Sequence, residues 1–136
     1  MYEALNIEFN SEHRLLISRP QGVVDDYSVM QLINFLLALE EVAESFNRVA
    51  DLRQATDISV SSPAIREYAE NRLKNLDHLA PFRAAIIAAS PDGEAAGRLY
   101  ATLMKGSKVD VGVFHNATSA AEWLGVPEAA LRAQIF

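Results

Sequence analysis

The sequence contains no cysteine among its 136 residues. Disulfide bridges, thiolate zinc sites and catalysis by a thiol are therefore excluded together. Basic residues are also scarce, because 12 Lys and Arg stand against 18 Asp and Glu and give a formal net charge of −6. The basic residues form no run, and an excess of negative charge is poorly suited to a phosphate backbone. We expect no nucleic-acid partner.

Long hydrophobic runs are also missing. The most apolar stretch, Val29 to Leu39, has 11 residues and includes Gln31 and Asn34, whereas a membrane-spanning helix needs about 20 apolar residues. The opening residues, Met1 to Ala4, lack the basic region and apolar segment of a secretory signal peptide. The sequence predicts no membrane span and favours a cytoplasmic location.

What is present is the composition of an ordinary globular domain. Half of the residues are hydrophobic and 22% are charged, which excludes disordered, collagen-like and coiled-coil classes. The length corresponds to about one domain, which can bury about two-thirds of its unfolded surface. Because we find no internal repeat, low-complexity tract or linker, we expect a single domain spanning residues 1–136.

The hydrophobic pattern predicts strands and helices that alternate along most of the chain. Residues 2–9 and 13–18 are separated by turn residues and predict an antiparallel hairpin. Residues 19–22 interrupt the pattern, and residues 53–62 are interpreted as a polar connection. Short apolar runs that follow helical patterns are typical of buried parallel strands, and they occur at residues 48–52, 82–89 and 109–114.

The expected helices have recognisable ends. The first runs from Asp25 or Asp26 to about Ser45, and a short last one covers residues 127–135. Three further helices are marked by the N-cap candidates Ser62, Ser90 and Asn116, with proline following both serines and with Gly106 and Gly125 as stops. This order predicts an α/β domain with a mixed sheet of about five strands, antiparallel in the opening hairpin and mostly parallel elsewhere, backed by four to five helices.

Several of these segments resemble a known family. They are the strand ending Ala50-Asp51-Leu52, the arginine-led strand at 83–87, and Val113-Phe114 followed by the helix at 120–124. Together they are similar to the SpoIIAA-like branch of the STAS fold, which is related to bacterial anti-sigma-factor antagonists. The resemblance covers roughly residues 2–125. It implies a mixed sheet backed by helices and a binding or regulatory role rather than catalysis. We expect a protein partner and no cofactor.

The same resemblance implies a candidate modification site. In phosphoswitch members of the family, a serine stands at the start of the helix after the Asp-Leu strand. The corresponding stretch here offers Ser59, Ser61 and Ser62 as phosphoacceptors, and a phosphate at a helix N-terminus is favoured by free N–H groups and the helix dipole. The glycine of the family's motif is missing and Pro63 follows. The alternative is therefore that Ser62 is simply the N-cap of this helix.

A small enzyme is the second alternative. His115 follows the last predicted strand, and Asp51 lies near the end of another. Because ligands of open α/β sheets bind beyond the carboxyl ends of the strands, the two side chains could share one site, with the carboxylate orienting the imidazole for acid–base chemistry. His13 and His78 fall on polar positions and form no ligand set with His115, so we expect no metal site.

The first predicted helix is apolar around most of its circumference. Its apolar side chains cover an arc of about 240°, whereas a helix on one face of a sheet needs a stripe little wider than about 100°. The excess is covered either by neighbouring elements or by a second subunit or an apolar ligand. The candidates for such an interface are Met30, Ile33, Phe35 and Leu37. Our leading hypothesis is a non-enzymatic module that binds a protein partner, forms a homodimer and takes a small apolar ligand.

Overall fold

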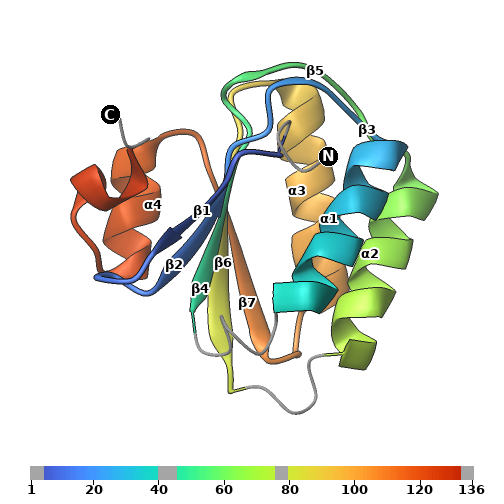
Figure 1. Ribbon diagram of the computed structural model, residues 1–136. Helices are drawn as coiled ribbons and strands as arrows, with labels where there is room; N and C mark the ends of the chain where they lie inside the picture. The colour runs from blue at the N-terminus through green and yellow to red at the C-terminus, as the bar shows by residue number, and fades with distance from the viewer. Residues whose placement is uncertain (1–4, 40–45, 76–79, 133–136) are drawn as a thin grey trace.

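A five-stranded mixed sheet forms the centre of the protein (Figure 1). The computed structural model describes residues 5–39, 46–75 and 80–132. In chain order its elements are β1 (Ile7–Asn10), β2 (Leu15–Ser18), β3 (Gly22–Asp25), α1 (Asp26–Leu39), β4 (Asn47–Asp51), β5 (Ala55–Ser59), α2 (Ser62–Asn75), β6 (Phe82–Ile87), α3 (Pro91–Met104), β7 (Val109–Phe114), α4 (Ala117–Leu124) and the 3₁₀ helix η2 (Glu128–Leu131).

The strand order of the main sheet is β1-β2-β4-β6-β7. Strands β1 and β2 are antiparallel, and every other neighbouring pair is parallel. The predicted fold class is therefore confirmed, including the opening hairpin. None of the helices in the described residues is long and apolar enough to cross a membrane.

Two strands were not predicted from the sequence. Strands β3 and β5 pair in parallel with each other and form a separate two-stranded sheet. The interpretation of residues 53–62 as a polar connection is therefore wrong over Ala55–Ser59. Three of these five residues are exposed and the other two are half-buried. The strand consequently carries none of the apolar pattern that marks a buried strand.

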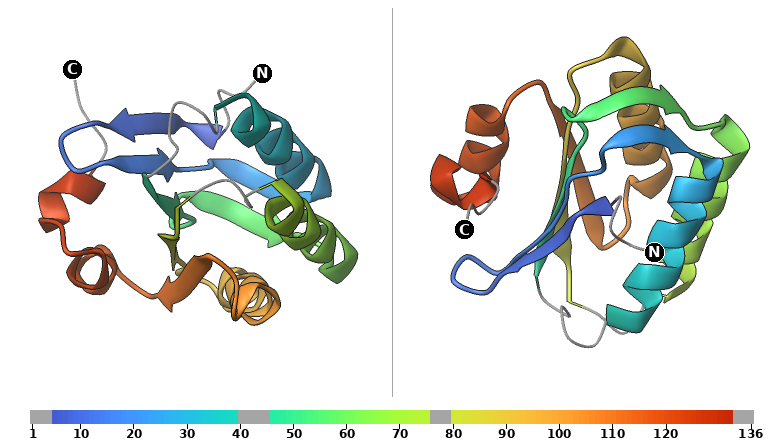
Figure 2. Two further views of the ribbon diagram at one scale, coloured as in Figure 1. Left: turned by 90° about the horizontal axis from the view of Figure 1, so that it is seen from below. Right: turned by 45° about the horizontal axis from the view of Figure 1, so that its top comes forward.

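The helices lie on both sides of the main sheet, with α4 and η2 on one side and α1, α2 and α3 on the other (Figure 2). Helix α4 faces the sheet with the small buried residues Ala117, Ala120 and Ala121. Helix α3 approaches β6 and β7 through Gly97, where a Cβ atom would lie 3.3 Å from side chains of both strands. Small residues therefore allow these two helices to pack close to the sheet.

Helices α1 and α2 are positioned differently. Helix α1 packs on α2 and β3, and α2 packs on α1 and α3. Large side chains, including Leu32, Leu36 and Tyr68, extend from the two helices toward Leu16 on the sheet. The structure describes α1 as far as Leu39, and the remainder of its predicted span, residues 40–45, lies outside the described residues.

Most predicted helix ends are confirmed by their hydrogen bonds. Ser90 Oγ accepts from Gly93 N at 3.1 Å, Asn116 Oδ1 accepts from Ser119 N at 2.8 Å, and Gly125 ends α4 with a φ of 74°. The cap of α2 is shifted by one residue from the prediction. Ser61 Oγ accepts from Ala64 N at 3.2 Å, and Ser62 is already the first helical residue. The predicted last helix is a 3₁₀ turn over Glu128–Leu131.

A buried ion pair joins the C-terminal turn to the opening hairpin. Arg19 donates to Glu8 Oε2 at 2.6 Å and to the carbonyl oxygen of Leu131 at 2.6 Å. The Arg19 side chain is 5% exposed and that of Glu8 is 20% exposed. Because breaking a buried pair leaves one charge uncompensated, this contact stabilises the attachment of η2 to the sheet.

We predict that Arg19→Met lowers the free energy of unfolding by about 3 kcal/mol, because it leaves the Glu8 carboxylate buried without its cation. Urea denaturation of the wild type and the variant measures this loss. Adding Glu8→Gln to Arg19→Met should recover part of it, since the second substitution removes the uncompensated charge. A single variant as stable as the wild type would contradict the prediction.

Candidate functional site

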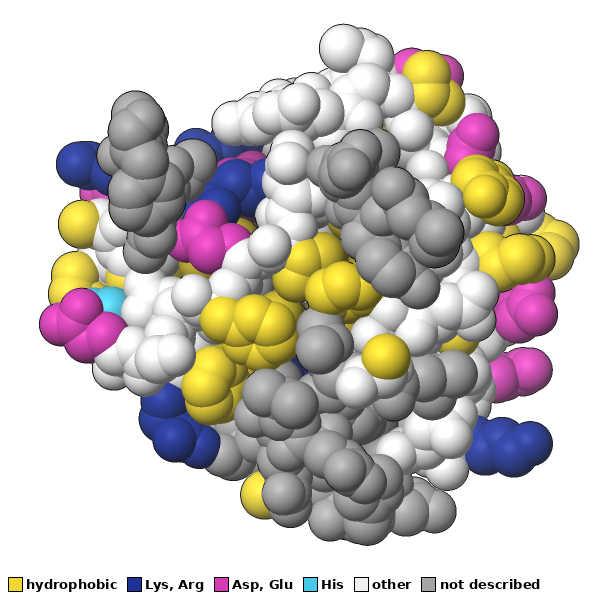
Figure 3. All heavy atoms as spheres, viewed as in Figure 1, with side chains coloured by type: hydrophobic (Ala, Val, Ile, Leu, Met, Phe, Trp, Pro, Cys, Tyr) yellow, Lys and Arg dark blue, Asp and Glu magenta, His cyan; other side chains and the backbone are white. Residues whose placement is uncertain are grey.

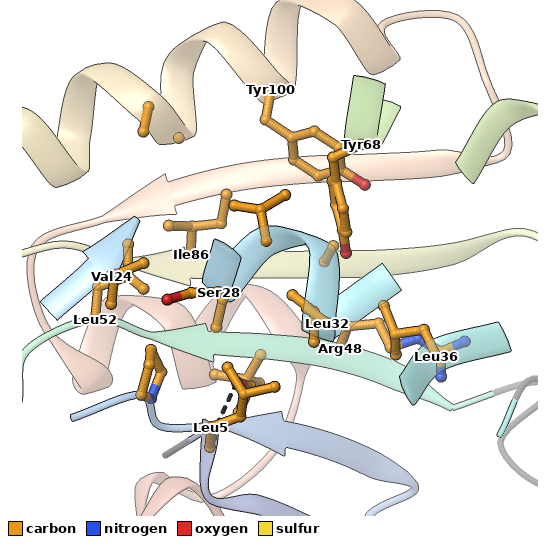
Figure 4. A pocket seen from close by; sticks show the side chains of 18 of the residues that line it. Leu5, Val24, Ser28, Leu32, Leu36, Arg48, Leu52, Tyr68, Ile86 and Tyr100 are labelled. Atoms are coloured by element: carbon orange, nitrogen blue, oxygen red, sulfur yellow. Dashed lines mark hydrogen bonds between the residues drawn. The ribbon is translucent and has the colours of Figure 1, made fainter. Parts of the chain in front are cut away.

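A cavity of about 190 Å³ lies between the main sheet and helices α1, α2 and α3 (Figure 4). Its floor is formed by the helix-facing side chains of β2, β4 and β6, including Leu16, Ala50 and Ile86. Its roof is formed by Leu32 and Leu36 together with residues of the other two helices. The helices on this side reach the sheet in different ways, because α1 and α2 extend large side chains toward it whereas α3 approaches it through Gly97.

Few polar groups line this cavity. Ser18 Oγ donates to the Leu5 carbonyl oxygen at 3.2 Å, so that hydroxyl is used within the wall (Figure 4). The rings of Tyr68 from α2 and Tyr100 from α3 pack against each other with centroids 5.2 Å apart. An apolar pocket with a few convergent polar groups is the usual character of a small-molecule site.

The charged side chains in the described part of the wall are both arginines, Arg48 and Arg72. The Arg48 guanidinium lies 4.6 Å from the centre of the Phe82 ring. Arg72 is only 3% exposed, donates to Asn71 Oδ1 at 2.8 Å, and lies 5.9 Å from the Tyr68 ring centre. Contact with aromatic faces allows a guanidinium to lie against apolar surface while it keeps its charge.

The structure divides the wide apolar arc of α1 into two faces. Leu32 and Leu36 line the cavity, whereas Met30 is 55% exposed. Of the other interface candidates, Ile33 and Phe35 are half-buried, and the side chain of Leu37 lies outside the described part of the chain.

Sequence reasoning missed two exposed residues beside Met30. Tyr27, one helical turn before it, is 66% exposed, and Val23 at the preceding strand is 56% exposed. We call Val23, Tyr27 and Met30 the α1 strip. On the face viewed in Figure 3, hydrophobic and acidic side chains alternate along the side of the molecule that carries α1 and α2. The spacing of Tyr27 and Met30, three residues apart on a helix, was a signal that could have identified the pair.

The three candidate phosphoacceptors lie at the start of α2. Ser59, Ser61 and Ser62 are all exposed. The backbone N–H and the hydroxyl group of Ser61 both donate to the carboxylate of Asp26, each at 2.7 Å. Both bonds lower the pKa of Asp26, and the bond from the backbone N–H has a larger effect than the bond from the hydroxyl. They join the first residue of α1 to the cap of α2.

This arrangement bears on the predicted phosphoswitch. A phosphate on Ser61 would lie against the Asp26 carboxylate, and two negative charges in contact repel each other. The phosphoswitch stays a prediction, and phosphate transfer to Ser59 or Ser62 would avoid this contact.

The structure gives the two strand-end candidates different partners. Asp51 is buried and accepts two hydrogen bonds from the Arg53 guanidinium, at 2.9 and 2.8 Å. His115 is exposed, and its Nε2 lies 3.9 Å from Glu94 Oε1. Strand β6 separates β4, which carries Asp51, from β7, which precedes His115. Asp51 therefore holds the turn between β4 and β5, and the structure does not bring it to His115.

Among the residues that the structure describes, no group of three or more His, Asp and Glu side chains could hold a metal ion. His13 lies 3.9 Å from Glu12, and His78 is outside the described ranges.

We predict that the Asp26–Ser61 contact makes stability depend on pH. Because the pKa of Asp26 is lowered in the folded protein, its contribution is present above the ordinary carboxyl pKa and is lost as the pH falls through the folded value. The wild type should be more stable than Asp26→Asn near pH 7, and the difference should shrink as the pH falls below about 4, the ordinary carboxyl pKa. Urea denaturation across this range measures it, with Asp57→Asn as an exposed control. A constant difference from neutral to acid pH would refute the prediction.

The protein is similar to known proteins in its three-dimensional structure. No protein-family model matches the sequence, and no curated protein matches it. A similar solved structure is that of an uncharacterized protein of the DUF3478 family, with a SpoIIAA-like fold, from Shewanella loihica PV-4. The two agree with a TM-score of 0.55 and 20% sequence identity, over 89% of this chain and 92% of the other. At this identity the likeness establishes the architecture, and the chain has the SpoIIAA-like fold.

Proposed function

We propose that this protein is a non-enzymatic regulatory or interaction module that binds a small apolar molecule in the cavity under α1 and α2. The observation that carries the proposal is the cavity itself, about 190 Å³ with a predominantly apolar wall. A dry protein cavity of about 150 Å³ is large enough to bind benzene. The volume here accommodates an aromatic ring with a short chain, or an aliphatic chain of similar size.

The packing around this space supports the same proposal. Protein interiors are close-packed and contain few voids larger than a water molecule. A space of about 190 Å³ between the sheet and three helices is therefore an exception to ordinary core packing, and a concave, mostly apolar space is the usual character of a small-molecule site.

We predict that propylbenzene binds to the protein and raises its thermal unfolding temperature, because a ligand that binds only the folded state stabilises it. Isothermal titration calorimetry and NMR shifts of cavity-lining methyl groups measure the binding. Ala96→Leu, on the half-buried cavity side of α3, should weaken binding by about tenfold or more because it fills part of the cavity.

Ala95→Leu is the matched control, since it places the same side chain one residue away on the exposed side of α3. It should bind propylbenzene like the wild type. Absence of binding to the wild type, or equal loss in both variants, would refute the proposed ligand site.

The exposed α1 strip supports a second part of the proposal, self-association. Tyr27 and Met30 are more than half exposed although they belong to a predominantly apolar helix. We propose that a second copy of the chain covers the strip through an isologous contact, the commonest closed arrangement of identical subunits. The acidic residues Asp25 and Asp26 then lie at the rim, because facing like charges would oppose the contact.

We predict that Met30→Asp shifts the protein from dimer to monomer without unfolding it, because it places a charge within the strip. Light scattering at high micromolar concentration measures the mass, and circular dichroism confirms folding. Ala95→Asp, exposed on α3, is the matched control and should leave the mass unchanged. A monomeric wild type at this concentration would contradict self-association while leaving the ligand site unaffected.

A further inference from the structure

We infer that β7 is the binding site for an extended segment of a protein partner. The segment adds to the main sheet as a further strand, antiparallel to β7, and places a basic residue opposite Asp110. This inference goes beyond the proposed function, because the edge formed by β7 belongs neither to the cavity wall nor to the α1 strip.

Every second residue of β7 directs its backbone N–H and C=O groups away from the sheet. Phe82 N, at the start of β6, donates to the carbonyl oxygen of Lys108 at 3.1 Å. Ala88 N, just after β6, donates to the carbonyl oxygen of Phe114 at 2.8 Å. Because a parallel ladder bonds through alternate residues, the even-numbered residues of β7 face β6 and the odd-numbered residues face outward. The outward residues are Val109, Val111 and Val113.

The first outward position is closed by a neighbouring side chain, and the other two are open. Val109 N donates to Ser107 Oγ at 3.1 Å, and this hydroxyl donates to the Val109 carbonyl oxygen at 3.4 Å. At Val111 and Val113, no hydrogen bond from the described residues reaches the outward backbone groups. Strand β7 lies at one margin of the main sheet, between α3 and α4 (Figure 2). Two donors and two acceptors are therefore available at the spacing that an added strand requires.

The opposite edge of the sheet, β1, has features that oppose such pairing. It has four residues, whereas β7 has six. It also carries the charged residue Glu8, which is bound by Arg19, and Asn10 Nδ2 donates to the Ala130 carbonyl oxygen of η2 at 3.4 Å. Short edge strands and inward-pointing charges are means by which natural sheets prevent edge-to-edge association. Strand β7 is longer, and its outward residues are valines, which favour strands.

Aromatic side chains on the α4 side of β7 indicate one feature of the partner. Phe114 and Trp123 are half-buried, with ring centroids 5.3 Å apart. Both rings lie over Gly112, where a Cβ atom would be 2.8 Å from Phe114 and 3.3 Å from Trp123. A partner side chain directly opposite Gly112 would contact this aromatic surface, so an apolar or aromatic residue is favoured there.

Asp110 indicates a second feature, a positive charge. Its side chain lies on the same face of β7 as Gly112, two residues away. Asp110 is exposed and forms no ion pair within the described parts of the chain. Arg83, its register partner on β6, donates to the Trp123 carbonyl oxygen and lies 5.1 Å from the centre of the Trp123 ring. Opposite charges on directly opposed strand residues attract, and the net charge of the chain is −6, so Lys or Arg is favoured opposite Asp110.

The experiment titrates the peptide acetyl-Thr-Val-Phe-Val-Lys-Thr-amide into the wild type and follows binding by NMR. In the inferred register the two peptide valines pair with Val113 and Val111. The phenylalanine then lies opposite Gly112 and the lysine opposite Asp110. Hydrogen exchange should find the amides of Val111 and Val113 unprotected in the free protein and protected by the peptide. The amides of Gly112 and Phe114 should be protected in both states.

Two methylated peptides distinguish strand pairing from other modes of binding. N-methylation of both peptide valines blocks the N–H groups that face β7. N-methylation of the phenylalanine and the lysine instead adds the same number of methyl groups to N–H groups that point away from β7. The first peptide should bind at least about tenfold more weakly than the second, because it loses two hydrogen bonds. Equal affinities, or no binding of the unmethylated peptide, would overturn the inference.

Replacement of the peptide lysine by glutamate tests the charge. It should weaken binding by about threefold or more, because two carboxylates would then face each other. Asp110→Asn should remove most of this difference, whereas Glu67→Gln, exposed on α2, removes the same charge elsewhere and should retain it. An undiminished difference in Asp110→Asn would refute the inferred register. Protection of Val111 and Val113 that rises with the concentration of the protein alone would assign β7 to a second copy and overturn the inference. None of these outcomes depends on propylbenzene binding, because β7 does not line the cavity.

Discussion

The distance at which each helix stands from the sheet is the constraint on which the rest of this structure depends. Helix α4 approaches through Ala117, Ala120 and Ala121, and α3 approaches through Gly97. Helices α1 and α2 instead extend leucine and tyrosine side chains toward the sheet. The cavity of about 190 Å³ lies between these helices, α3 and the sheet. The same constraint explains why α1 and α2 depend on other contacts, namely the β3–β5 pair, the Asp26–Ser61 bonds and each other.

The sequence allowed most of the architecture to be predicted because the elements of the main sheet carry strong local signals. Strands such as Phe82–Ile87 are buried on both faces except at Arg83 and appear as mostly apolar runs. Helix starts were found where a serine or asparagine side chain caps the first turn. Strands β3 and β5 were missed because each has only the other as partner, and their residues remain largely accessible. The shift of the α2 cap from Ser62 to Ser61 has a similar cause, since adjacent serines are locally indistinguishable and the choice is made by Asp26 from a distant segment.

The candidate site could be anticipated only in part. The wide apolar arc of α1 did indicate an apolar ligand or partner, because a helix on one sheet face needs less apolar surface. The cavity itself is a difference in packing between helices, and no local pattern encodes such a difference. Arg48 and Arg72 looked like scattered basic residues, since they are far apart in the sequence and only the folded chain brings both to the cavity wall. A shared site of Asp51 and His115 was one alternative because both follow strands, but Arg53, two residues along from Asp51, donates to its carboxylate.

Helix α1 contributes one face to the cavity wall and another to the protein surface. Leu32 and Leu36 form part of the roof, and Tyr27 and Met30 of the same helix are exposed. The bonds between the N-terminal ends of α1 and α2 are solvent-exposed, and exposed hydrogen bonds with few buried contacts characterise the regions of a protein that open at low free-energy cost. A ligand could move α1 only if it bound more tightly to one position of this helix than to another. The cavity is lined by the sheet and by α1 together. A ligand that contacted both would have such a difference in affinity and could change the exposed α1 strip, whereas a ligand that touched only the sheet would leave the strip unchanged.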